Sequence, residues 1–168
     1  MREIVLREAQ PEDAEKLLAF MKTIGGESDN LSFGPEGLPI TAEQERFFLQ
    51  GLQEDPQSVF YCAWKGAELV GTGSVSSLPR RMRHRAELAV SVVKAEWGSG
   101  IGSMLMAELI AYARHHGIEI LNLEVRADNA RAIRLYEKFG FRHIGISPAF
   151  FKIGSTYADF ELMYLDLR

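Results

Sequence analysis

Cysteine is nearly absent from this sequence, since Cys62 is the only one among 168 residues. A single cysteine excludes an internal disulfide and is typical of a protein kept in a reducing compartment. Cys62 lies in an apolar run from Val59 to Trp64, which favours a small buried hydrophobic residue over a nucleophile. We therefore expect neither a disulfide framework nor an acyl-enzyme on this residue.

Long apolar runs and a strong excess of one charge are also missing. No stretch approaches the roughly 18 uninterrupted apolar residues of a membrane span, and Arg2 and Glu3 are charged where a secretory signal would be apolar. The 19 Lys and Arg against 23 Asp and Glu give a net charge of −4, which is too acidic for a dedicated nucleic-acid binder. We therefore expect a cytoplasmic protein without nucleic-acid or membrane partners.

The composition is that of an ordinary globular protein. Hydrophobic residues make up 46% of the chain and charged residues 25%, which gives no reason to expect disorder or a fibrous repeat. The length suits one domain, and no internal repeat, linker or low-complexity segment divides the chain. We predict a single domain over residues 1–168.

Hydrophobic periodicity and turn residues predict an alternation of strands and helices. The expected order is a strand at 3–8, a helix opened by Pro11, a helix capped by Thr41, strands at 58–65, 68–77 and 85–93, a helix at 100–116, a strand at 118–126, a helix capped by Asn129, and strands at 141–147 and 156–166. The first helix should end near Gly25 and Gly26. The predicted fold class is mixed α/β, with a mostly antiparallel seven-stranded sheet flanked by about four helices.

One helix joins the strands at 85–93 and 118–126, so these two strands should be parallel neighbours with a right-handed crossover. They would form the one parallel pair of the sheet. Ligands of such sheets bind outside the carboxyl ends of the strands. We therefore expect a ligand crevice where these two strands end.

A glycine-rich run, residues 97–103, precedes the helix predicted at 100–116. Glycines permit positive φ and bring backbone N–H groups close to an anion, while the helix start adds its dipole. A phosphate or pyrophosphate is the ligand that such a run is expected to bind. The spacing G-x-G-x-G fits neither the dinucleotide fingerprint G-x-G-x-x-G nor a P-loop. On this run alone, a structural turn and a nucleotide-binding domain both stay open.

A second motif lies downstream and has the form N-x-x-A-x-x-x-Y-x-x-x-G-F. Its specified positions are Asn129, Ala132, Tyr136, Gly140 and Phe141. This motif, together with Gly100 and Gly102 in the glycine run, resembles the two signatures of the GCN5-related N-acetyltransferases (GNAT family). Trp97 stands where that family most often has Arg or Gln. The resemblance extends over nearly the whole chain and implies transfer of an acetyl group from acetyl-CoA to an amine.

The resemblance also implies where acetyl-CoA binds. Backbone amides of the glycine run would hold the pyrophosphate, and the pantetheine arm would lie along the strand at 85–93, where the amide near Val90 would polarise the thioester carbonyl. The expected coenzyme-binding residues are Leu88, Ala89, Val90, Ser91, Val92, Gly98, Ser99, Gly100, Ile101, Gly102, Ser103, Asn129, Ala132 and Tyr136.

The expected catalytic groups are Tyr136 and one of two glutamates. Spacing alone makes Tyr136 a core aromatic, but the resemblance implies a general acid that protonates the departing thiolate, whose thiol has a pKa of about 8.5. The amine acceptor is mostly protonated at neutral pH and needs a base. Glu87 is preferred and Glu124 is the second candidate. Each could instead be a solvated or salt-bridged strand residue, since Arg126 lies near Glu124 in sequence.

Other expectations concern metals, partners and the rival function. No metal cofactor is expected, because the histidines lack paired ligand spacing; they are His84, His115, His116 and His143. A homodimer is plausible from aromatic residues that are expected to be exposed on the C-terminal edge strands, namely Phe150, Phe151, Phe160 and Tyr164. The alternative function is a non-catalytic, CoA-binding regulator in which Tyr136 and the glutamates serve packing. The acceptor amine stays open.

Overall fold

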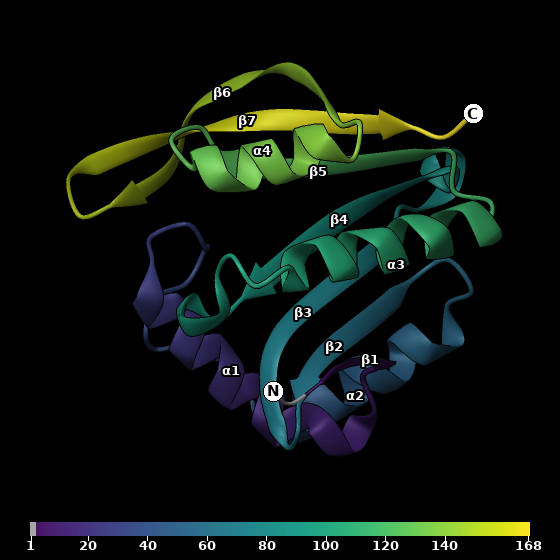
Figure 1. Ribbon diagram of the computed structural model, residues 1–168, viewed down its shortest axis with the longest axis vertical. Coiled ribbons are helices and arrows are strands. Elements are labelled where there is room, and N and C mark those ends of the chain that lie inside the picture. The colour runs from purple at the N-terminus through teal and green to yellow at the C-terminus, as the bar shows by residue number, and fades with distance from the viewer. Residues whose placement is uncertain (1–2) are drawn as a thin grey trace.

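Seven strands form one sheet in the order β1-β2-β3-β4-β5-β7-β6, which confirms the predicted fold class (Figure 1). The computed structural model describes residues 3–168, so Met1 and Arg2, which bear on the predictions about a secretory signal and a single domain, lie outside the described residues. The strands are β1 (Ile4–Glu8), β2 (Val59–Lys65), β3 (Glu68–Ser77), β4 (Arg85–Val92), β5 (Ile120–Arg126), β6 (Arg142–Ile153) and β7 (Thr156–Asp166).

Four α-helices accompany the sheet, and two of the predicted caps are present. The helices are α1 (Ala14–Glu27), α2 (Ala42–Glu54), α3 (Ile101–His115) and α4 (Ala130–Lys138). The Thr41 Oγ1 atom accepts from the Gln44 amide at 3.1 Å, and the Asn129 Oδ1 atom accepts from the Ala132 amide at 3.3 Å. Within residues 3–168, no helix is both long and apolar enough to cross a membrane.

The helices pack in two hydrophobic clusters. One joins α1 and α2 to β2 and β3 around Leu17 and Val70, and it buries Cys62 as predicted; burial raises the pKa of that thiol to about 12. The other joins α3 and α4 to β4, β5 and β7 around Leu121 and Met163. The second cluster supports the two helices that carry the sequence motifs.

The only parallel pair in the described sheet is β4 with β5, as predicted. The strands are in register from Arg85 to Glu87 against Ile120 to Asn122, and no pairing continues beyond these residues. Figure 1 shows the two strands diverging towards their carboxyl ends. The sheet therefore opens between β4 and β5, where the crevice was expected.

Helix α1 ends at Glu27, next to the two glycines where its end was expected, and Gly25 lies in close contact with the following loop. Two other sequence expectations were wrong in detail. Strand β6 runs to Ile153 instead of residue 147, through bulges and a positive φ of 51° at Ala149. Phe160, expected to be exposed, is 4% exposed, and its ring centroid lies 4.5 Å from that of Phe150.

Candidate active site

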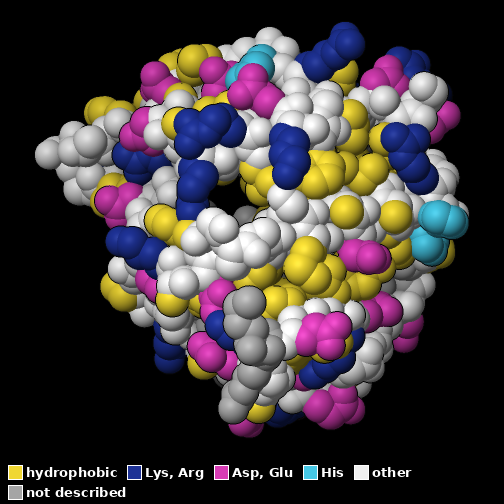
Figure 2. Space-filling view, in the orientation of Figure 1, with side chains coloured by type: hydrophobic (Ala, Val, Ile, Leu, Met, Phe, Trp, Pro, Cys, Tyr) yellow, Lys and Arg dark blue, Asp and Glu magenta, His cyan; other side chains and the backbone are white. Residues whose placement is uncertain are grey.

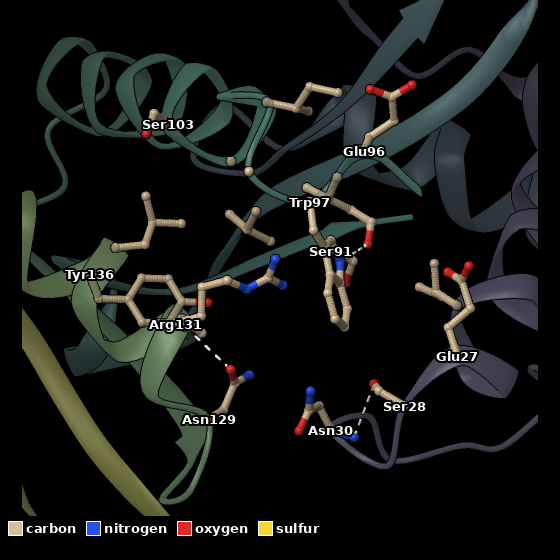
Figure 3. Close-up of a pocket in the computed structure, with 18 of the residues that line it drawn as sticks. Glu27, Ser28, Asn30, Ser91, Glu96, Trp97, Ser103, Asn129, Arg131 and Tyr136 are labelled. Carbon is tan, nitrogen blue, oxygen red and sulfur yellow. Dashed lines mark hydrogen bonds between the residues drawn. The ribbon is translucent and has the colours of Figure 1, made fainter. Parts of the chain in front are cut away.

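A cavity of about 260 Å³ lies beside the opening between β4 and β5. Its walls are the carboxyl half of β4, the glycine run before α3, the first turns of α4, and the end of α1 with its following loop (Figure 3). Figure 2 shows the corresponding hollow between α4, the start of α3 and that loop. The lining residues are Ile24, Glu27, Ser28, Asn30, Leu31, Val90, Ser91, Val92, Glu96, Trp97, Gly98, Gly100, Ile101, Gly102, Ser103, Asn129, Arg131, Ala132, Leu135 and Tyr136.

The glycine run presents unpaired backbone donors to this cavity. Gly100 is the N-cap of α3 with a φ of 93°, and no side chain caps the helix. Within the described residues, the amides of Ile101, Gly102 and Ser103 find no protein acceptor. Free N–H groups and the dipole at a helix start bind anions. These residues therefore fit the pyrophosphate of a coenzyme.

Trp97 is fixed by contacts with the protein itself. Its Nε1 atom donates to the Val92 carbonyl oxygen at 2.9 Å. The Arg131 guanidinium lies 3.8 Å from the centroid of the indole ring, and Figure 3 shows the Arg131 side chain extending across the cavity towards it. The indole therefore serves as a platform for a cation of α4 at the position where the family has a polar side chain.

Tyr136 contributes a protonated phenol to the cavity wall. Its side chain is 7% exposed, and its ring centroid lies 6.0 Å from that of Phe141. Burial raises the pKa of Tyr136 to about 12, so the hydroxyl keeps its proton at neutral pH. No hydrogen-bond partner for this hydroxyl is found in the part of the chain that the structure describes. The proton is therefore available to a ligand.

The two candidate glutamates lie near each other, outside the residues that line the cavity. Glu87 is in register with Asn122, and Glu124 lies two residues further along β5 on the same side of the sheet. This side is opposite to Leu88 and Leu123, which are buried in the cluster of α3 and α4. Burial, and then the charge of Glu87, raise the pKa of Glu124. The structure thus gathers two carboxylates beside the opening in the sheet.

The salt-bridge interpretation of Glu124 is not supported. Arg126 donates instead to the Asp128 carboxylate, with Nε 2.8 Å from Oδ1, and to the Asp29 carbonyl oxygen at 3.0 Å. Among residues 3–168, neither Glu87 nor Glu124 forms an ion pair. Both carboxylates are therefore open to a cationic partner.

Most of the expected coenzyme-binding residues line the cavity, and three do not. Leu88 is buried, Ala89 is exposed and does not line the cavity, and the Ser99 hydroxyl donates to the Glu96 carbonyl oxygen at 2.5 Å. Sequence reasoning missed the wall formed by α1 and its loop, because those residues lie more than 60 positions before the glycine run. It also missed Arg131, although this residue lies inside the second motif. The missed lining residues are Ile24, Glu27, Ser28, Asn30, Leu31, Glu96, Trp97, Arg131 and Leu135.

No metal centre is found among residues 3–168, where no three His, Cys, Asp or Glu side chains are grouped closely enough to hold an ion. His143 contacts the Glu161 and Glu137 carboxylates, and these hydrogen bonds raise the pKa of His143. That a metal is not needed stays a prediction.

The cavity and its motifs lie in a segment with known relatives. Residues 27–141, which include every lining residue except Ile24, match the acetyltransferase (GNAT) family. The chain belongs to this family. The family assignment predicted from the two motifs is therefore confirmed.

Individual relatives agree with the family assignment. The N-alpha-acetyltransferase RimI of Mycobacterium tuberculosis is 33% identical over 104 residues, which cover 61% of this chain and 64% of the relative. The match therefore spans less than two thirds of that relative's length.

Solved structures match over nearly the full chain. An acetyltransferase of the GNAT family from Streptococcus pneumoniae has a TM-score of 0.94 and 30% identity, covering 98% of this chain and 99% of that one. The Salmonella typhimurium protein yncA, solved with its cofactor acetyl-CoA, has a TM-score of 0.85, with coverage of 98% and 94%. At 19% identity, the yncA structure shows a shared fold alone.

Proposed function

We propose that this protein transfers the acetyl group of acetyl-CoA to a primary amine by direct attack in a ternary complex. The observation that carries the proposal is one cavity lined by both the free amides at the start of α3 and the protonated phenol of Tyr136. The amides suit a pyrophosphate and the phenol suits a leaving thiolate. The acetyltransferase family of the chain supports both assignments.

The coenzyme would extend from the glycine run along β4 towards Tyr136. The amides of Ile101, Gly102 and Ser103 would accept the pyrophosphate. The pantetheine arm would lie against Val90 to Val92, which line the cavity at the edge where β4 has left β5. The amide near Val90 would then polarise the thioester carbonyl.

Two proton transfers complete the proposed reaction. The amine nitrogen attacks the thioester carbonyl carbon, the C–N bond forms, and the C–S bond breaks. Tyr136 donates its proton to the departing sulfur, and a glutamate accepts the proton released by the amine. Glu124 is the preferred base, because its raised pKa makes it a stronger proton acceptor than an ordinary carboxylate. Glu87, the residue preferred from sequence, would raise that pKa through its charge.

A cationic amine is the acceptor that the charges favour. Glu87 and Glu124 lie side by side without a basic partner in the described chain, and the whole chain carries a net charge of −4. An acceptor that arrives as an ammonium would be attracted to the pair and could lose its proton there. The proposed acceptor is a primary amine of a small molecule or a protein, and the mycobacterial relative is described as an N-alpha-acetyltransferase.

A titration followed by an assay tests this function. Calorimetry with acetyl-CoA, NAD and ATP measures which ligand binds, and free thiol is then followed with a panel of amines. Binding of acetyl-CoA alone, with thiol release that depends on one class of amine, supports the transferase. Tighter binding of NAD or ATP contradicts it, and coenzyme binding without release for any amine identifies a non-catalytic regulator.

We also propose that residues 1–168 form a single domain, that the protein is cytoplasmic and that it forms a homodimer. Strand β1 at one end of the chain and β7 at the other belong to the same sheet, which supports one domain. The exposed Ile144 and Ile146 on the edge strand β6 favour a second copy as a partner.

A further inference from the structure

Two hydrogen bonds attach the segment after α1 to the strands β4 and β5. The Lys94 amide, two residues beyond the end of β4, donates to the Glu27 Oε1 atom at 3.0 Å. The Nη1 atom of Arg126, the last residue of β5, donates to the Asp29 carbonyl oxygen at 3.0 Å. We call residues 27–31, which begin at the last residue of α1, the strap. The strap is therefore fixed to both strands beyond the point where they separate.

The strap closes the opening between β4 and β5 at its carboxyl end. Glu27 and Asp29 are two residues apart, so their Cα atoms lie within about 7 Å of each other. This short piece of backbone joins strands whose pairing ends at Glu87 and Asn122. Figure 1 shows the loop after α1 between the carboxyl ends of β4 and β5. The opening is thus bounded by the paired residues at one end and by the strap at the other.

Arg126 is well suited to hold the strap. Its side chain is 19% exposed, and its Nε atom donates to the Asp128 Oδ1 atom at 2.8 Å, which neutralises and orients the guanidinium. A planar guanidinium carries several N–H donors in a fixed geometry, so it can serve a carboxylate and a carbonyl oxygen together. Arg126 also lies on the same side of the sheet as Glu124, two residues before it on β5. The strap is therefore held on the side that carries the proposed base.

The strap also faces the cavity that contains the proposed acid. Ser28, Asn30 and Leu31 line this cavity, and Figure 3 shows Ser28 and Asn30 on the opposite side of it from Tyr136. Tyr136 packs with α3 and α4, whereas Glu124 lies on the other side of the sheet. A reaction that uses both groups must therefore take place at the opening between β4 and β5, where the strap forms one edge.

We infer that Arg126 is a positioning residue for the acceptor amine, because it holds the strap at the edge of the opening through which the amine nitrogen reaches the thioester. The inference rests on the proposed function, since it takes acetyl transfer as the reaction. Arg126 does not line the cavity and acts through the strap. Glu27 has the corresponding role on the side of β4. A loosened strap would leave the amine poorly placed between Glu124 and the thioester.

Steady-state kinetics test this role with the most active amine of a panel that contains spermidine, lysine and a short peptide with a free N-terminus. Arg126→Ala should raise the KM for the amine by about tenfold, as for loss of a hydrogen bond to a charged group, and leave the dissociation constant of acetyl-CoA within about threefold. Arg126→Lys keeps the charge on a single ammonium and should recover part of the loss. Glu27→Ala should resemble Arg126→Ala, whereas Glu27→Gln keeps the acceptor oxygen and should recover most of the loss.

Hydrogen exchange followed by mass spectrometry tests the attachment of the strap without turnover. Peptides that cover residues 26–36 should exchange faster in Arg126→Ala and Glu27→Ala, but not in Arg114→Ala, which removes an exposed charge near the far end of α3. Unchanged exchange or an unchanged amine KM in Arg126→Ala would overturn the inference, as would a loss of acetyl-CoA affinity as large as the rise in KM. If the wild type acetylates no amine, the proposed function itself fails, and exchange then shows separately whether Arg126 holds the strap. Thermal melting of each variant checks that the fold is retained.

Discussion

The backbone of Gly25 packs against the carbonyl group of Gly34 so closely that a Cβ on Gly25 would overlap the Gly34 oxygen. This contact fastens the loop after α1 to the last turn of the helix. From that loop, Ser28, Asn30 and Leu31 reach the cavity. The glycine therefore determines the position of a cavity wall that lies far from the sequence motifs.

Gly25→Ala should destabilise the protein by about 1–3 kcal/mol, because the loop must move away from the added methyl group. Gly26→Ala is the matched control, since its Cβ would lie at an ordinary 3.4 Å from the Pro35 Cβ atom. A helix interior favours alanine over glycine by roughly 0.5–1 kcal/mol, so the control should be neutral or stabilising. Urea unfolding of both variants measures the difference, and equal stabilities would refute the contact's importance.

Tyr136→Phe should lower kcat by about 10²-fold or more while leaving coenzyme affinity and melting temperature near the wild-type values. The phenyl ring keeps the packing against Phe141, and only the proton donor is lost. Steady-state kinetics and calorimetry on the same preparation separate the two effects. A variant with full activity would exclude Tyr136 as the general acid.

Glu87→Gln should shift the acidic limb of the pH dependence of kcat to lower pH. Its negative charge contributes to the raised pKa of Glu124, so its removal lowers that pKa and keeps Glu124 ionised in more acidic solution. Glu124 faces Leu162 on its other neighbouring strand, β7, and Arg126 is engaged with Asp128. The exposed Glu43→Gln serves as the control. A profile that moves to higher pH, or a Glu124→Gln variant with unchanged kcat, would contradict Glu124 as the base.

The ionised carboxylate of Asp55 should stabilise the folded state even in mildly acidic solution. Burial opposes its ionisation, but hydrogen bonds from Ser77, Gln57 and Ser58 outweigh that effect and lower the pKa of Asp55 to about 2. Since the unfolded value is about 3.9, the stabilisation is present above that pH and is lost as pH falls towards 2.

Asp55→Asn should cost about 1 kcal/mol at neutral pH, after allowance for solvent screening, and its stability should approach that of the wild type near pH 2. Unfolding by urea across this pH range checks the prediction. Glu54→Gln, at an exposed neighbouring carboxylate, should follow the wild type throughout. A stability difference that does not change with pH would show that ionisation of Asp55 plays no part.

Patterns among residues close together in the sequence predicted most of the fold and part of the site. The caps at Thr41 and Asn129 depend on neighbouring residues, and the positive φ at Gly100 is one that glycine permits without strain. Contacts between distant segments were not predictable: Arg131 on Trp97 joins residues from two different motifs, and the pKa of Glu124 depends on a separate strand. The bulges also extended β6 beyond the point where local sequence predicted its end.

The most direct test of acetyl transfer is mass spectrometry of the amine after incubation with acetyl-CoA and the protein, with free thiol measured in the same sample. We expect an N-acetylated amine and free thiol in equal amounts with the wild type, and little of either with Tyr136→Phe. Thiol release without an acetylated amine, or formation of the product at the same rate in Tyr136→Phe, would contradict the proposed reaction.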